Sequence, residues 1–141
     1  EIRPRDWSSD VCSSDLFMAA AVSDYIPEHP QNGKLKKEMI GEHWNIPMKQ
    51  NVDLLATCDK EGIKTVAFKA ETDPSVATEN AQNLLKRKGA DAVCLNIIDE
   101  TNPFGSNTNR IDFITAHENT PLPKNDKLTL SLALLEKAEK L

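Results

Sequence analysis

Apolar and polar residues alternate along the chain in two patterns, which predict strands and helices in turn. Two short apolar runs, 17–22 (FMAAAV) and 92–95 (AVCL), are typical of strands buried in a parallel sheet. Residues 65–68 and 110–115 form two more predicted strands between polar flanks. Residues 44–48 also alternate, although Pro47 weakens that strand pattern.

One predicted helix carries a start and a stop signal. Asp73 is a suitable N-cap and Pro74 occupies the first helical position. Small and apolar side chains follow at helical spacing, the last turn is basic, and Gly89 can end the helix. Weaker signals predict a short helix over 52–58, capped by Asn51, and a final helix over 131–141.

Strands that alternate with helices predict an α/β domain, a Rossmann-like, mostly parallel sheet with flanking helices. Ligands of such folds bind outside the carboxyl ends of the strands. We therefore expect Asp24, residues 68–72 and Asn96, with the loop after it, along one rim of the sheet. Residues 26–37 hold two prolines and an Asn-Gly pair, which predict a loop.

Composition narrows the class of protein. The 141 residues suffice for one domain, and the net charge of -5 argues against a nucleic-acid partner. No apolar run approaches the ~18 residues of a membrane-spanning helix, so we expect no membrane partner. The three cysteines form no C-x-x-C pair and no zinc-ligand pattern with histidine. This cysteine usage suits a reducing, cytoplasmic compartment.

The first sixteen residues differ from the rest of the chain. They are rich in Ser and Asp and follow neither the helical nor the strand period. Residues 6–16 (DWSSDVCSSDL) resemble an in-frame translation of a sequencing-adapter oligonucleotide. We therefore expect residues 1–16 to be a non-native, disordered tail. Residues 17–141 would then be the carboxyl-terminal portion of a domain truncated on its N-terminal side.

The residues alone leave the chemistry open. The chain contains no G-x-G-x-x-G, no G-x-x-x-x-G-K-[ST] and no G-x-S-x-G motif. Lys34, Lys36 and Lys37 beside Gly33 fit a flap over a polyanion and equally fit a solvated surface patch. Lys88 either complements a helix dipole or contacts an anion. From the residues alone, these features predict an α/β domain that binds a small anion and do not identify a reaction.

Six ordered segments extend the interpretation: A-A-V-S-D-Y (20–25), G-K-L-K-K (33–37), N-V-D-L-L (51–55), F-K-A-E-T (68–72), K-G-A-D-A-V-C-L-N (88–96) and F-G-S-N-T-N (104–109). The series resembles the carboxyl-terminal part of phosphopantothenate–cysteine ligase, the synthetase part of the bifunctional coenzyme A flavoprotein of bacteria. The resemblance covers nearly all of residues 17–141.

The resemblance implies a CTP-dependent acid–amino-acid ligase that uses Mg²⁺ and joins 4′-phosphopantothenate to cysteine. The acid would be activated as an acyl-cytidylate, and the cysteine amine would then displace CMP. Charge neutralisation and positioning of a triphosphate would be the main tasks of such a site. The resemblance also implies a homodimer and a flavin-dependent decarboxylase as a fused or associated unit. Because that unit binds the flavin, we expect no FMN on this chain.

The same resemblance assigns the CTP site residue by residue: Asp24, Lys34, Val52, Asp53, Leu54, Phe68 and Lys88. Lys34 is the implied catalytic residue, in a flap that reaches the phosphates, and the metal ligands stay unknown. Two positions depart from the family. Val52 stands in place of a proline, and Leu84 replaces a lysine that many members carry one turn before Lys88.

Three alternatives remain open. The chain could be a non-catalytic dimerisation or binding fragment, or an ATP-using α/β ligase relative. The missing G-x-G-x-x-G argues against the third, a nicotinamide-type Rossmann protein. A Gly-rich strand-turn-helix and an S-S-G-x-M-G-like motif of the family have no counterpart in residues 17–141. We therefore expect this chain by itself to be inactive.

Overall fold

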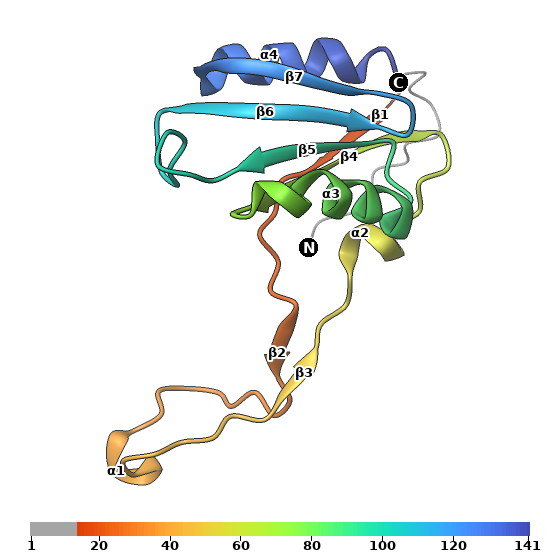
Figure 1. Ribbon diagram of the computed structural model, residues 1–141. Helices are drawn as coiled ribbons and strands as arrows, with labels where there is room; N and C mark the ends of the chain where they lie inside the picture. Colours follow the sequence, from red (N-terminus) through yellow and green to blue (C-terminus); the bar gives the residue numbers. More distant parts are fainter. Residues whose placement is uncertain (1–13) are drawn as a thin grey trace.

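A computed structural model of the chain describes residues 14–141, which form one mixed sheet with a projecting arm (Figure 1). The strand order is β1-β4-β5-β6-β7. Strands β1 (Ser14–Met18), β4 (Ile63–Glu71) and β5 (Ala92–Ile97) are parallel. Strands β6 (Thr108–Thr115) and β7 (Asn119–Asp126) continue the sheet in antiparallel fashion. The predicted α/β class is confirmed.

Helices cover both faces of the sheet, which explains the continuous apolar runs in β4 and β5. Helix α3 (Pro74–Lys88) lies on one face and α4 (Lys127–Ala138) lies on the other (Figure 1). Successive residues of β4 therefore enter different cores: Ala67 packs on the α3 side and Val66 on the α4 side. Because both faces are buried, neither strand needs a polar face.

The ends of α3 are those that the sequence predicts. The Asp73 carboxylate accepts a hydrogen bond from the Ser75 N–H (2.9 Å), and Pro74 starts the helix. Gly89 ends it with φ 58°, a left-handed conformation that glycine adopts without steric cost. Both predicted boundaries of this helix are therefore confirmed.

The first strand begins earlier than expected. Its residues 14–16, which we predicted to be part of a disordered tail, pair with β4, and Leu16 lies opposite Thr65. Leu16 packs toward the α3 side and Phe17 toward the α4 side, so the alternating side chains supply both cores. The prediction of disorder is wrong for these three residues. Residues 1–13 lie outside the described part, and the adapter origin of the segment stays a prediction.

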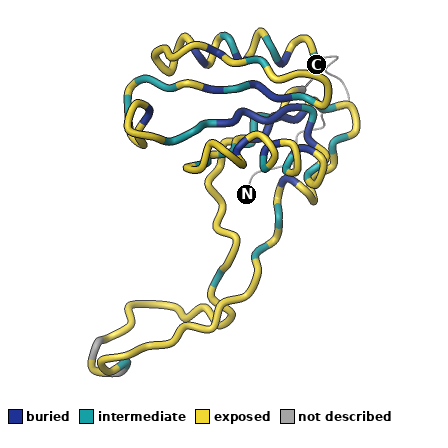
Figure 2. Tube along the Cα trace, viewed as in Figure 1, coloured by how far each residue is buried: buried dark blue, intermediate teal, exposed yellow. Residues whose placement is uncertain are grey.

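A thin arm leaves the sheet between β1 and α2 (Leu54–Thr57) (Figure 1). Strands β2 (Tyr25–Pro27) and β3 (Met48–Gln50) pair in antiparallel fashion, and the segment between them carries the one-turn helix α1 (Lys37–Ile40). Most of the arm is exposed (Figure 2). The strand predicted over 44–48 is displaced to Met48–Gln50, because Pro47 has no N–H to donate to a ladder.

Two helix starts and one strand differ from the predictions. The N-cap of α2 is Asp53 rather than Asn51, and α4 starts at Lys127, after the N-cap Asp126, rather than at residue 131. Strand β7 was not predicted because it contains two prolines, which an edge strand tolerates. Within residues 14–141 no helix has the length and apolarity to cross a membrane.

Candidate functional site

Six of the seven predicted nucleotide-binding residues line one cavity of about 180 Å³ on the α3 side of the sheet. They come from four segments that are distant in sequence: the loop after β1, the turn into α2, the middle of β4 and the last turn of α3. The six residues are Asp24, Val52, Asp53, Leu54, Phe68 and Lys88. Strands β1 and β4 are parallel, and the carboxyl end of β1 lies at this cavity, where Met18 pairs with Ala67 next to Phe68.

Asn51 fixes the turn that carries three of these residues. Its side-chain Nδ2 donates to the Ser23 carbonyl (3.0 Å), and its backbone N–H donates to the Asp24 carbonyl (2.8 Å). Its Oδ1 accepts from the Val52 N–H (2.9 Å). The sequence indicates Asn51 only as a helix cap, whereas in the structure it joins the two sides of the cavity.

Asp53 and Lys88 form an ion pair at the cavity wall. One carboxylate oxygen of Asp53 meets Lys88 Nζ, while the other accepts from the Ala56 N–H (3.1 Å) and caps α2. The hydrogen bond from Lys88 lowers the pKa of Asp53, and this effect outweighs the opposing effect of burial. Lys88 is therefore held in place at the cavity, with 18% of its side chain exposed.

The end of α3 has a second anchor that the sequence does not indicate. Lys60 Nζ donates to the Lys88 carbonyl (2.7 Å), where the helix leaves its last carbonyl groups without intrahelical partners. Leu84, the departure from the family, also lines the cavity and presents an apolar surface there. Among the lining residues in the described part, two are carboxylates and one is a cation, so a triphosphate would need further positive charge.

Lys34 lies apart from the other six. It belongs to the exposed segment of the arm between β2 and α1, and it is not among the residues that line the cavity. Residues 28–36 are all exposed, so this stretch is not packed against the sheet. Six of the predicted residues therefore meet at the sheet, whereas the role of Lys34 in a flap stays a prediction.

A larger cavity, of about 620 Å³, lies on the α4 side of the same edge. It shares Met18, Ala20 and Phe68 with the smaller cavity, so the two spaces adjoin at the carboxyl ends of β1 and β4. Phe68 is 38% exposed there, although the three residues before it in β4 are buried. The polar lining comprises Lys69, Asn96, Asn109, Lys127 and Ser131.

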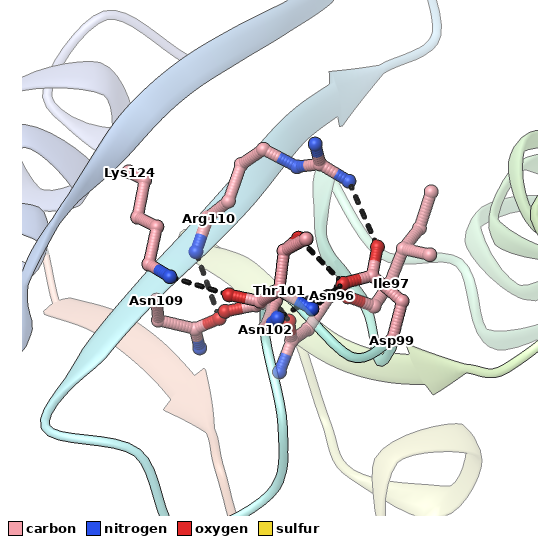
Figure 3. A network of polar contacts seen from close by, with 8 residues as sticks. All are labelled: Asn96, Ile97, Asp99, Thr101, Asn102, Asn109, Arg110 and Lys124. Atoms are coloured by element: carbon pink, nitrogen blue, oxygen red, sulfur yellow. Dashed lines mark hydrogen bonds and ion pairs between the residues drawn. The ribbon is translucent and has the colours of Figure 1, made fainter.

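A polar network fixes the loop after β5 beside the larger cavity (Figure 3). Asp99 Oδ1 accepts from the Thr101 hydroxyl (2.6 Å) and from the N–H groups of Thr101 (2.8 Å) and Asn102 (2.9 Å). The hydrogen bond from the Thr101 hydroxyl is the main cause that lowers the pKa of Asp99, and nearby Arg110 adds to it. Asn102 itself is buried to 2% exposure.

Within the described residues, no three His, Cys, Asp or Glu side chains come together as a metal site. A Mg²⁺ ion that accompanies a nucleotide needs less, since phosphate oxygens and water supply most of its ligands. Asp24 at the smaller cavity is a carboxylate that fits such a role.

Comparison with known proteins identifies the family. A sequence model described as DNA/pantothenate metabolism flavoprotein C-terminal domain matches residues 7–141. The coenzyme A biosynthesis bifunctional protein CoaBC of Vibrio vulnificus strain CMCP6 is 32% identical over 132 residues, which cover 90% of this chain and 32% of that protein. CoaBC of Borreliella burgdorferi is 29% identical over 124 residues, with 86% and 30% covered. The chain thus spans about a third of the length of these relatives.

Solved structures share the fold. The crystal structure of the C-terminal domain of a CoaBC protein superposes with a TM-score of 0.66 at 23% identity, and covers 90% of this chain and 54% of that one. A Cab2 mutant in complex with phosphopantothenate-cysteine gives a TM-score of 0.62 at 17% identity, with 86% and 43% covered. At these identities the likeness concerns the fold.

Proposed function

This chain belongs to the DNA/pantothenate metabolism flavoprotein C-terminal domain family, and we propose that it supplies the CTP-binding part of a phosphopantothenate–cysteine ligase. Its family is the ligase domain of a coenzyme A biosynthesis protein. The observation that carries the proposal is the meeting of six residues from separate segments around one cavity.

The proposed reaction makes an amide from a carboxylate and an amine. A carboxylate is a poor electrophile, so its oxygen first attacks the α-phosphorus of CTP while the bond to pyrophosphate breaks. The cysteine amine then attacks the acyl carbon of the acyl-cytidylate, the acyl–oxygen bond breaks, and CMP leaves as the amine loses a proton. No protein nucleophile is needed, because the residues bind, orient and neutralise charge.

Each of the six predicted residues at the smaller cavity has a role in this proposal. Phe68 offers an aromatic face for the cytosine, and the turn from Val52 to Leu54 offers backbone groups to its edge. Lys88 contacts the phosphates and is oriented by Asp53. The cavity volume of about 180 Å³ is below the range of a whole small-molecule site, so these residues would hold part of the nucleotide.

Mg²⁺ would bind mainly through phosphate oxygens, with Asp24 as its protein ligand, and would neutralise part of the triphosphate charge. Lys34 would supply further positive charge when the arm closes toward a bound nucleotide. This part of the proposal gains support from the excess of carboxylates among the described lining residues, which one lysine does not offset.

The arm fits a role in homodimer formation. Tyr25, Trp44, Ile46 and Met48 expose 58%, 51%, 45% and 48% of their surface, a high share for large apolar side chains on a thin projection. A second copy is the proposed partner, and light scattering would give twice the mass of one chain. Substitution of Trp44 and Ile46 by serine should return the measured mass to that of a single chain.

The complete activity is proposed for the whole protein, with 4′-phosphopantothenate and cysteine as substrates and a flavin-dependent decarboxylase as a fused or associated unit. FMN is not part of the proposal for this chain. This chain spans 54% of the solved C-terminal domain of CoaBC, and we propose that it does not complete the reaction alone. A reducing, cytoplasmic location completes the proposal.

Calorimetry with CTP and ATP tests the nucleotide assignment. We expect the chain to bind CTP at least about 10-fold more tightly than ATP, because backbone groups distinguish bases by their donors and acceptors. Phe68→Ala and Lys88→Met should weaken CTP binding, whereas the exposed control Lys140→Met should not. Equal affinities would favour the ATP-using alternative, and no nucleotide binding would favour the non-catalytic one.

A further inference from the structure

Lys88 is held at two points by one segment of the chain. Its side-chain Nζ meets the Asp53 carboxylate at the start of α2, and its backbone carbonyl accepts from Lys60 Nζ (2.7 Å) in the turn after α2. Leu55 of α2 is buried in one cluster with Leu85 of α3, so the two helices pack where Figure 1 shows them side by side. The segment 53–60 therefore fixes both the backbone and the side chain of this lysine.

The turn that closes α3 leaves the Lys88 carbonyl for such a donor. The N–H groups of Gly89 and Ala90 donate to carbonyls of the preceding turn, at 3.4 and 3.1 Å, the arrangement in which a left-handed glycine ends a helix. These two bonds serve carbonyls that lie before Lys88 in the sequence. A charged side chain from outside the helix then supplies the donor to the carbonyl of Lys88 itself, and Lys60 occupies this position.

Lys60 has a defined place in the fold. Its own carbonyl accepts from the Ile63 N–H (3.1 Å), which closes the turn between α2 and β4. The residue is half-buried, and its Nζ lies 3.9 Å from the point where a Cβ at Gly89 would stand. Lys60 thus packs over the end of α3, although it is not among the residues that line the smaller cavity.

The charge of Lys60 is placed where an anion site at this end of α3 needs it. The carbonyl end of a helix carries partial negative charge and is an unfavourable place to bind an anion. Lys88 lies at that end, it is the one cation among the described lining residues, and Asp53 already balances its charge. The Lys60 ammonium offsets the partial charge of the helix end without entering the cavity, so the potential at Lys88 becomes more favourable for phosphate.

We propose that Lys60 is the positioning residue of Lys88 and holds this lysine where the phosphates of a bound nucleotide can accept from it. The inference rests on the proposed function and adds to it a residue outside the cavity. Lys60 acts through the backbone carbonyl of Lys88 and touches no ligand itself. Loss of Lys60 should therefore weaken contacts to phosphate and leave contacts of the base with Phe68 unchanged.

Titration of the full 141-residue chain with CTP and, separately, with cytidine tests the inference. Lys60→Met keeps most of the apolar stem and should raise the Kd for CTP about 3- to 10-fold, the range of one typical hydrogen bond. The Kd for cytidine, which has no phosphate, should not change. Lys60→Arg keeps a charged donor and should retain CTP affinity. Lys86→Met removes an exposed lysine from the same last turn of α3 and serves as the matched control.

A double variant shows whether the effect passes through Lys88. Added to Lys88→Met, Lys60→Met should cause no further loss of CTP affinity, because the side chain that it positions is gone. Full additivity of the two losses, or an equal loss of CTP and cytidine affinity, would overturn the inference. Absence of nucleotide binding by the unsubstituted chain would instead overturn the proposed function.

A titration without nucleotide gives the second measurement. The hydrogen bond from Lys88 lowers the pKa of the Asp53 carboxyl, so ¹³C spectra of that carboxyl report whether Lys88 Nζ keeps its place. In Lys60→Met the pKa of Asp53 should rise toward its ordinary value, and in Lys60→Arg it should stay low. A pKa of Asp53 that is the same with and without Lys60 would contradict the inference, whatever the nucleotide titrations give.

Discussion

Lys88 and Asp53 form an ion pair that joins the last turn of α3 to the first turn of α2. The pair bridges two elements that are separated by β4 in the sequence, and both partners line the smaller cavity. Asp53 thereby has two functions in the fold, since its second carboxylate oxygen caps α2.

The double function of Asp53 predicts an order of stability among its variants. Asp53→Asn retains an oxygen that can cap α2 and loses only the charge opposite Lys88. Asp53→Ala loses both, so we expect it to cost about 1 kcal/mol more in free energy of unfolding than Asp53→Asn. Urea unfolding measures both, with the exposed Glu136→Ala as control. Equal losses for the two variants would show that the cap contributes nothing.

Acid should destabilise the domain through carboxyl groups whose pKa is lowered in the folded state. For Asp73 and Asp126 the main cause is a hydrogen bond from Ser75 and Thr129, respectively, and for Glu71 it is the one from Lys69. A lowered folded pKa gives stability that is present above the unfolded value and lost as pH falls through the folded value.

We therefore expect the urea midpoint to stay level above about pH 5 and to fall below about pH 4. Asp73→Asn, which can still cap α3 but no longer titrates, should make that fall shallower. An unchanged midpoint down to pH 3 would contradict the prediction.

The two cysteines of the described part should differ sharply in reactivity. Cys94 lies in β5 with no exposed surface, and burial raises the pKa of its thiol to about 12, whereas Cys58 is exposed. Because the thiolate is the reactive form, iodoacetamide at pH 8 should modify Cys58 and leave Cys94 intact in the native chain. Peptide mass spectrometry locates the label, and unfolding in urea should make both sites react.

Lys34 is the predicted site residue that the structure leaves away from the cavity. If the arm brings it to the triphosphate, Lys34→Ala in a complete ligase should slow acyl-cytidylate formation more than about 10-fold, as expected for one lost contact to a reacting phosphate. Single-turnover kinetics measure this step directly, and Lys140→Ala serves as a control on an exposed lysine. An unchanged first step would remove Lys34 from the mechanism.

Local signals were enough to predict some elements and not others. Helix α3 was predictable because its cap, first-turn proline and final glycine all lie within its own sequence. Strand β7 was not, because its two prolines argue against a strand, and what stabilises it is the antiparallel pairing with β6 and the packing of Leu122 under α4. The start of β1 was hidden because residues 14–16 form part of the adapter-like string.

Some residues of the candidate site were likewise predictable from the sequence, and others were not. Asp24 and Phe68 were expected at one edge because parallel strands end there, and the cavity confirms that they lie together. The roles of Lys60 and Asn102 depend on contacts with the carbonyls of Lys88 and Ile97, which no periodicity or spacing reveals. Lys34 belongs to an exposed segment of the arm and does not line this cavity, so the strand order that predicts Asp24 and Phe68 does not extend to it.

The position of β1 in the sheet has a consequence for the order of folding. The whole arm lies between β1 and its partner β4, whereas a short turn joins β6 to β7. Closing the longer loop costs more chain entropy, so the β6–β7 hairpin should form early and β1 should dock late. Since β1 has one neighbouring strand within residues 14–141, as β7 does, its amide protons should also exchange with deuterium ahead of those in the central strand β5.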